Sequence, residues 1–469
     1  MRVAGRTLGS LLLLSFTNHI TQNVASVPFL WIVPLVLYLV TFILVFDVGS
    51  SRGKSGWYFR PVFVPLLFGL IIAIAYGLDD GYAYLNVHVA IPLFCAGLFV
   101  GCMFCHGELA ALRPAPKYLT RFYLMLSIGG AAGGLMVGVV APLVFKTFLE
   151  LPLALAACGL LAAYVSWLSP AAGGKPLLKW GMPLASLLVT GVAGWYLWGY
   201  VGYQYQDALL LHRDFYGTLR VKQDGPTDDP ASTRRLIHGV ISHGSEHTHE
   251  PLRGKPISYF GPDSGIARVV QFYGEERPAI RVGVVGLGIG VLAAWGRPGD
   301  TYRIYELVPA VVDIAKSHFW YLTGAKANIE YALGDGRLSL ERDPPQHFDM
   351  LSIDAFSSDS IPMHLMTREA LRVYMSRIRP DGAIVYNVTN RFINLAPMVK
   401  LLAEAEGMKA ILISHSPDSD EYNYTDYVVV TNNEKLLAHA RFAEPAEIDK
   451  LPGLKVWTDD YNNLFDVLR

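Results

Sequence analysis

The chain has 469 residues and a mass of 51.7 kDa, is 52% apolar and only 17% charged, and carries a formal net charge of −1. This composition excludes a disordered chain, a collagen-like repeat and a small disulfide scaffold. It also disfavours a wholly soluble protein, because soluble globular proteins carry roughly 25% charged residues. A net charge near zero gives no general affinity for nucleic acid.

The charge is unevenly distributed along the chain. Residues 1–204 hold about 16 charged side chains, and the remaining part holds about 63. The first part therefore suits lipid and the second suits water. We expect a transmembrane helical domain over residues 1–204, a small β-rich subdomain over 205–265 and an α/β catalytic domain over 266–469.

Apolar stretches of spanning length recur through the first part, each close to the roughly 20 residues that a helix needs to cross the hydrocarbon core. They predict about seven spans, near residues 8–27, 28–46, 61–78, 84–104, 121–146, 150–168 and 181–199. We therefore expect a multi-pass protein of a cell membrane, with the lipid bilayer as one partner.

The orientation of this bundle follows from its basic loops, but it conflicts with the chemistry described below. Seven crossings and the positive-inside rule place residues 47–60, 105–120 and 169–180 in the cytoplasm, and hence the C-terminal domain outside. A cytosolic metabolite requires that domain inside. We expect a cytoplasmic domain and one segment that does not cross fully, either the first one or the glycine-rich region 129–134.

Beyond residue 213 the pattern changes to short strands and turns, and then to strands that alternate with helices. Buried strands are predicted at 281–286, 302–306, 330–333, 348–353 and 383–387, with helices at 290–296, 308–319 and 367–379. This alternation predicts a Rossmann-like, doubly wound and mostly parallel sheet, preceded by the small β subdomain.

The ends of four of these strands carry groups that suit a nucleoside. Gly286, Gly288 and Gly290 form a GxGxG loop after the first strand, where backbone N–H groups can approach a ligand. Glu306 ends the second strand, where a carboxylate can accept hydrogen bonds from ribose hydroxyls. Asp335 and Gly336 follow the third strand, where the carboxylate is placed for the amino group of a purine, and Asp354 follows the fourth.

The order of these motifs, together with the string Asp354–Asp359, resembles the spermidine synthase (aminopropyltransferase) superfamily, and in particular its bacterial membrane-fused members. The resemblance extends over nearly the whole chain. It includes the strings at 17–22, 27–31, 105–109, 127–130, 259–265, 380–382 and 457–460.

The resemblance implies a transferase that uses S-adenosylmethionine or its decarboxylated form as a substrate and releases methylthioadenosine. Glu306 would hold the ribose and Asp335 the adenine. Asp354 would take a proton from an attacking amine, Tyr259 would line the substrate side, and Asp359 would be a second acidic residue. A sulfonium needs no acid to activate its leaving group, so catalysis requires positioning and one base.

Three departures from the family pattern concern the amine. Ile289 stands where soluble members have an aspartate that contacts the donor's amine. Phe260 and Gly261 replace the polar and acidic residues that normally follow Tyr259. Asp359 lies five residues after Asp354 instead of three. Nucleoside recognition is therefore expected, putrescine is in doubt as the acceptor, and full S-adenosylmethionine is as good a donor as its decarboxylated form.

Several further expectations complete this interpretation. The acceptor would be a polyamine or a membrane-resident molecule, and the family implies a homodimer. No metal site is expected, because His247 and His249 have poor spacing and no third ligand. Arg337 is expected at the surface or beside the ribose. The alternatives are a lyase-like or methyltransferase activity on S-adenosylmethionine, and a transporter or sensor gated by nucleoside binding.

Overall fold

The computed structural model describes residues 2–24, 29–46, 55–79, 87–168, 176–239, 241–356 and 362–468. The chain divides into two compact units, Met1–Thr218 and Leu219–Arg469. The domain boundaries expected near residues 204 and 265 stay a prediction.

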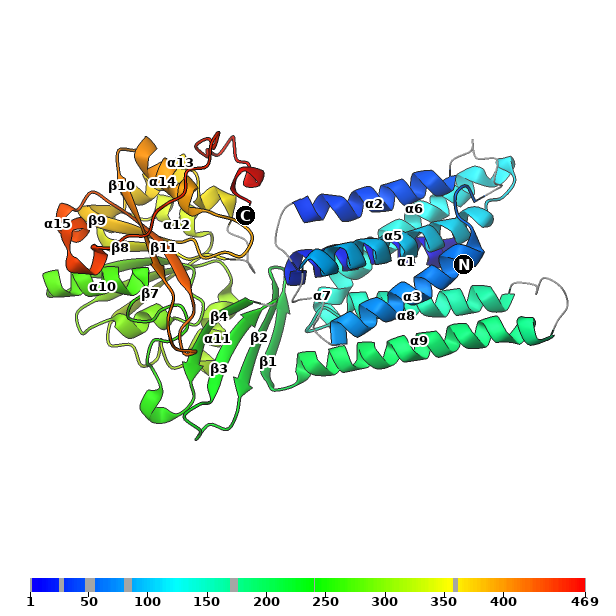
Figure 1. Cartoon of the computed structure of the whole chain (residues 1–469), viewed down its shortest axis with the longest axis horizontal. Helices are drawn as coiled ribbons and strands as arrows, with labels where there is room; N and C mark the ends of the chain where they lie inside the picture. Colours follow the sequence, from blue (N-terminus) through cyan, green and yellow to red (C-terminus); the bar gives the residue numbers. More distant parts are fainter. Residues whose placement is uncertain are drawn as a thin grey trace. The chain divides into compact units, whose positions relative to one another are not determined.

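The first unit is a helical bundle (Figure 1). Its α-helices are α1 (Arg2–His19), α2 (Phe29–Phe46), α3 (Arg60–Asp79), α5 (Val87–Ala111), α6 (Leu119–Leu135), α7 (Ala141–Val144), α8 (Glu150–Leu168) and α9 (Pro176–Tyr205). Two π-helical turns, Ile20–Val24 and Met136–Val140, extend α1 and α6, a 3-10 turn at Pro116–Tyr118 precedes α6, and strand β1 (Ala208–Asp214) follows α9.

Within the described residues, five helical segments are long and apolar enough to cross a membrane. They are Arg60–Asp79, Val87–Ala111, Pro116–Val144, Glu150–Leu168 and Pro183–Tyr205, and the apolar helix Leu30–Phe46 is shorter. These segments match the later predicted spans. The first predicted span, 8–27, is not among them.

Helix α1 differs from the five segments in its surroundings. It contacts α2, α5, α6 and α8, so most of its neighbours are other helices of the bundle. Its buried residues include Ser15 and His19 beside Leu12 and Phe16. Polar groups inside such a bundle need partners, and the His19 imidazole lies 3.3 Å from the Asn23 side-chain amide.

The second unit contains a seven-stranded sheet in the order β10-β11-β9-β8-β5-β6-β7. The strands are β5 (Arg281–Val285), β6 (Thr301–Glu306), β7 (Asn328–Leu333), β8 (Phe348–Ile353), β9 (Ile378–Asn387), β10 (Lys409–His415) and β11 (Thr425–Thr431). Strands β5 to β9 pair in parallel, whereas β11 is antiparallel to both β9 and β10. The predicted doubly wound sheet is confirmed, and β10 and β11 extend it beyond the prediction.

Helices cover both faces of this sheet. Figure 1 shows α12 (Gly336–Arg342), α13 (Arg368–Met375) and α14 (Ala396–Ala405) on one face, and α10 (Gly265–Glu276) and α11 (Pro309–His318) on the other. The predicted helix 290–296 is wrong in type, because Val291–Trp295 is a short 3-10 helix. The left-handed backbone of Gly290 (φ 83°) precedes it.

Three short strands precede the large sheet in this unit: β2 (Gly217–Asp224), β3 (Thr233–His238) and β4 (Ile241–His247). They pair antiparallel in sequence order. The β-rich texture expected in this region is therefore present. Strand β4 packs on the glycine loop after β5, because a Cβ at Gly244 would lie 2.8 Å from Cγ1 of Ile289.

Candidate active site

The predicted site residues follow neighbouring parallel strands. Gly286 follows β5, Glu306 ends β6, Asp335 follows β7 by two residues and Asp354 follows β8. The strand order reverses at the β5–β8 pair. Strands β6 and β7 lie on one side of β5, whereas β8 and β9 lie on its other side. Ligands of open α/β sheets bind outside the carboxyl ends of the strands at such a reversal.

The glycine loop approaches Asp354 so closely that its first residue has no room for a side chain. Gly286 has φ 94°, and a Cβ there would lie 2.4 Å from the carbonyl oxygen of Asp354. Gly288 has φ 55°, and a Cβ there would lie 2.7 Å from the carbonyl oxygen of His243. The backbone N–H of Asp354 donates to the Val285 carbonyl at 2.9 Å, which joins the two strand ends.

Glu306 supports this loop from the neighbouring strand. Its carboxylate accepts hydrogen bonds from the backbone N–H groups of Leu287, at 2.9 Å, and Val308, at 2.8 Å. Burial raises the pKa of Glu306, and these backbone donors oppose that rise. A carboxylate has about four acceptor positions, so Glu306 keeps some capacity for a further donor.

Asp354 is the most perturbed acid of the strand-end row. Burial raises its pKa to about 7, and the hydrogen bond from Asn387 opposes this rise. The Asn387 side-chain amide donates to Oδ1 of Asp354 at 2.8 Å, and its own carbonyl accepts from the backbone of Thr389 at 3.0 Å. A carboxyl group with a pKa near 7 can act as a general base at neutral pH.

Two phenols lie near this carboxylate. Burial and, second, the charge of Asp354 raise the pKa of Tyr259, and the same two causes raise the pKa of Tyr427. The hydroxyl of Tyr427 donates to the backbone carbonyl of Tyr259 at 3.4 Å. The structure therefore places Tyr259 near Asp354 and adds Tyr427 of β11, which no motif indicated.

Asp335 caps the N-terminus of α12. Its Oδ1 accepts from the backbone N–H of Leu338 at 2.9 Å, and its Oδ2 lies 2.8 Å from Nε2 of His364. Gly336 is required for this close packing, since a Cβ there would lie 2.5 Å from Cγ1 of Val285.

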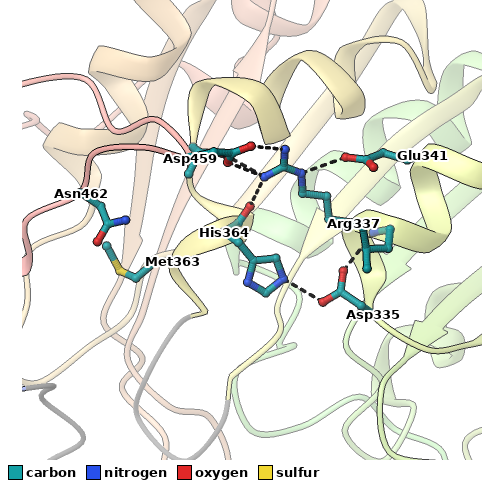
Figure 2. Close-up of a pocket in the computed structure, with 9 residues that line it drawn as sticks. Asp335, Arg337, Glu341, Met363, His364, Asp459 and Asn462 are labelled. Atoms are coloured by element: carbon teal, nitrogen blue, oxygen red, sulfur yellow. Dashed lines mark hydrogen bonds and ion pairs between the residues drawn. The ribbon is translucent and has the colours of Figure 1, made fainter.

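An open cavity of about 710 Å³ adjoins this carboxylate. Figure 2 shows Asp335 hydrogen-bonded to His364, with Met363 and Asn462 on the other side of the histidine. The cavity is lined by Asp335, Arg337, Leu338, Glu341, Met363, His364, Thr367, Asp459 and Asn462.

The remaining predicted residues have mixed outcomes. Asp359 lies outside the described residues. Ile289 is fully buried, and its apolar side chain occupies the position. His247 bonds to Glu421 at 2.8 Å, and the described residues contain no cluster of three metal-ligating side chains. Arg337 is not a surface residue: it is only 9% exposed and pairs with Asp459.

Sequence reasoning also missed residues of this region. Asn387 carried a usable signal, because it is the polar residue at the end of the predicted strand 383–387. His364 and Asp459 carried none, because neither lies at the end of a sheet strand and their relation to Asp335 arises only from tertiary packing.

Comparison with known proteins shows a partial similarity to a polyamine aminopropyltransferase. Over 112 residues the chain is 32% identical to the polyamine aminopropyltransferase of Vibrio vulnificus (strain CMCP6), a stretch that covers 23% of this chain and 37% of that protein. The chain therefore spans well under half the length of this curated relative. No family model matches the chain.

The solved structures to which the chain is similar include a probable spermidine synthase, a spermidine synthase and a putative O-methyltransferase, all at low TM-scores. A probable spermidine synthase from Corynebacterium glutamicum has 16% identity and a TM-score of 0.37, with 46% of this chain and 77% of that chain covered. Spermidine synthase from Thermotoga maritima has 12% identity and a TM-score of 0.33, with 49% and 75% covered. A putative O-methyltransferase from Klebsiella pneumoniae has 16% identity and a TM-score of 0.27, with 35% and 78% covered.

Proposed function

We propose that this chain is a membrane-integrated, aminopropyltransferase-like enzyme that acts on S-adenosylmethionine or its decarboxylated form, with Asp354 as the base. One observation carries the proposal. A buried carboxyl group with a pKa of about 7 adjoins a glycine loop that leaves no space for side chains, at the reversal point of a doubly wound sheet. The similarity to a polyamine aminopropyltransferase supports the reaction class.

In the proposed reaction an amine nitrogen attacks the carbon next to the sulfonium. The new C–N bond forms as the C–S bond breaks, and methylthioadenosine leaves as a neutral thioether. The extra proton on the nitrogen passes to the carboxylate of Asp354. Positioning and this single proton transfer account for the catalysis, because the leaving group needs no acid.

The nucleoside would lie across the strand ends. Glu306 would accept from the ribose hydroxyls with its remaining lone pairs, and Asp335 would accept from the amino group of the adenine. The positive φ angles of Gly286 and Gly288 let the loop pack closely on the backbone of Asp354 and His243, at the strand ends across which the nucleoside would lie.

The donor's own amine finds no acidic partner at residue 289, where Ile289 packs against β4. This favours full S-adenosylmethionine over a strict requirement for the decarboxylated form, because an acidic group there would repel the carboxylate of the full donor. The acceptor would be a polyamine or a membrane-resident amine.

A lyase-like reaction is a second candidate, and a specific observation favours it. Phe260 and Gly261 follow Tyr259, where the resembled family carries polar and acidic residues that handle the amines. In this case Asp354 would help the donor's own side chain to displace or eliminate methylthioadenosine.

One incubation separates these candidates. Purified chain is mixed with labelled S-adenosylmethionine or its decarboxylated form, with and without polyamines, and the products are identified by mass spectrometry. Methylthioadenosine that requires an amine supports the transferase, and methylthioadenosine without any acceptor supports the lyase. S-adenosylhomocysteine would mean methyl transfer and contradict both, and tight binding without turnover would favour a sensor.

A further inference from the structure

A segment near the C-terminus, residues 457–462, lies against the N-terminus of α13. The Trp457 side chain is fully buried, and its carbonyl accepts from the backbone N–H of Arg368 at 2.9 Å. Two residues later, the backbone N–H of Asp459 donates to Glu369 at 3.0 Å. This segment, which we call the C-terminal strap, is therefore anchored on both sides of residue 458.

The strap reaches α12 through one ion pair. Asp459 accepts two parallel hydrogen bonds from the guanidinium of Arg337, both at 2.7 Å, and a third from the hydroxyl of Thr367 at 2.8 Å (Figure 2). Bidentate pairs of this kind fix direction as well as distance. The Asp459 carboxylate stays charged, because Arg337 holds its pKa below the usual range.

Arg337 links Asp459 to two features that orient Asp335: the first turn of α12 and His364. It lies two residues after Asp335, in the first turn of the helix that Asp335 caps. Its Nη1 also donates to the backbone carbonyl of His364 at 2.9 Å, and the imidazole of His364 bonds to Oδ2 of Asp335 at 2.8 Å. The Arg337 residue therefore holds both the start of α12, which Asp335 caps, and His364.

We infer that Asp459 is a positioning residue: through Arg337 it fixes the start of α12 and His364, and so sets the direction in which Asp335 meets the 6-amino group of a purine. The inference rests on the proposed function for the assignment of Asp335. It goes beyond that function by making the strap part of base recognition, although Asp459 belongs to no strand end and need not touch the ligand.

The test compares two nucleosides on the purified full chain by calorimetry. Methylthioadenosine carries the 6-amino group, and the corresponding purine riboside lacks it. Asp459→Asn should weaken binding of methylthioadenosine about tenfold, the scale of one hydrogen bond to a charged group, and should change binding of the riboside less than twofold. The matched control Asp460→Asn removes the same charge one residue along the strap and should leave both affinities unchanged.

Two further variants keep the test decisive. In an Asp335→Asn background, Asp459→Asn should cause no additional loss. If Asp459→Asn does not fold, the comparison uses Asp459→Glu, which keeps the charge but displaces it by one methylene.

The possible failures are distinguishable. If the natural chain binds methylthioadenosine but Asp459→Asn behaves like Asp460→Asn, or weakens both nucleosides equally, this inference alone is overturned. A natural chain that binds neither nucleoside overturns the proposed function and this inference with it.

Discussion

The side-chain amide of Asn387 donates a hydrogen bond to Oδ1 of Asp354 at 2.8 Å, across the neighbouring ends of β9 and β8. This donor stabilises the ionised carboxylate, whereas burial favours the protonated acid. The balance leaves the pKa of Asp354 at about 7. The pair therefore sets the pH at which the proposed base becomes available.

Activity should depend on the ionised form of Asp354. The rate of methylthioadenosine formation, measured as kcat/KM, should rise about tenfold per pH unit below pH 7 and level off above it, because only the carboxylate can accept a proton. Asp354→Asn should abolish product formation while methylthioadenosine still binds. A variant that keeps most of its activity would show that Asp354 is not the base.

Asn387→Ala should move this pH profile to higher pH. Without the amide donor the pKa of Asp354 rises, and a hydrogen bond to a charged group is worth about 1.5 to 3 kcal/mol, or roughly one to two pKa units. Asn394→Ala is the matched control, because the Asn394 amide binds Asp449 instead. An unchanged midpoint in Asn387→Ala would exclude a role in tuning the base.

Asp354 should lower the free energy of unfolding at neutral pH. Its pKa is about 7 in the folded chain and about 3.9 in an unfolded one, so the folded state binds the proton more tightly. The stability of the natural chain should therefore fall as pH rises from about 4 to 7. Asp354→Asn should melt close to the natural chain near pH 4 and several degrees higher above pH 7. Equal Tm values at pH 8 would contradict the buried-acid description.

Gly286→Ala should disrupt the site through a steric clash. Its Cβ would lie 2.4 Å from the carbonyl oxygen of Asp354, and its φ of 94° adds the strain of a left-handed backbone, about 1 to 2 kcal/mol. Gly407→Ala isolates the strain, since Gly407 has φ 71° and open space around its Cβ position. We expect both variants to lose stability and only Gly286→Ala to lose methylthioadenosine formation.

The sequence was most informative about Gly286, Glu306, Asp335 and Asp354, because strand periodicity placed each at the end of a parallel strand. Such ends meet at one edge whatever the loops do. It was least informative about contacts that unite distant segments. Asp459 and His364 serve Asp335 through packing between α12, α13 and the strap, and no local pattern records that packing. The helix expected at 290–296 is instead the 3-10 helix Val291–Trp295, which the left-handed Gly290 precedes.

The side of the membrane on which the α/β unit lies can be tested with two introduced cysteines. Residues 219–469 contain no cysteine, so Asp229→Cys, at an exposed turn, would be the only thiol there. Ala115→Cys reports the loop between α5 and α6. Its neighbours Arg113, Lys117 and Arg121 favour the cytoplasm for this loop, and a cytosolic sulfonium donor requires the cytoplasm for residue 229.

Three helical segments separate these two positions: α6 with its π-helical turn and α7, then α8, then α9. If all three segments cross, the two cysteines lie on opposite sides. Residues 115 and 229 can therefore both be cytoplasmic only if one of the three segments does not cross fully. Whether α1 crosses has no effect on this comparison, which removes the first segment as the explanation. We expect the glycine-rich α6 segment, which the π-helical turn at Met136–Val140 interrupts, to be the incomplete crossing, an assignment that departs from the positive-inside rule for the basic loop 169–180.

A membrane-impermeant maleimide should therefore spare both cysteines in intact cells and label both after lysis. Of the four natural cysteines, Cys102, Cys105 and Cys158 are buried and give little background, and the partly exposed Cys95 is replaced by serine. Labelling of Ala115→Cys alone would show that all three segments cross and that the basic loop lies outside. Labelling of Asp229→Cys in intact cells would place the site away from a cytosolic donor and contradict the proposed substrate.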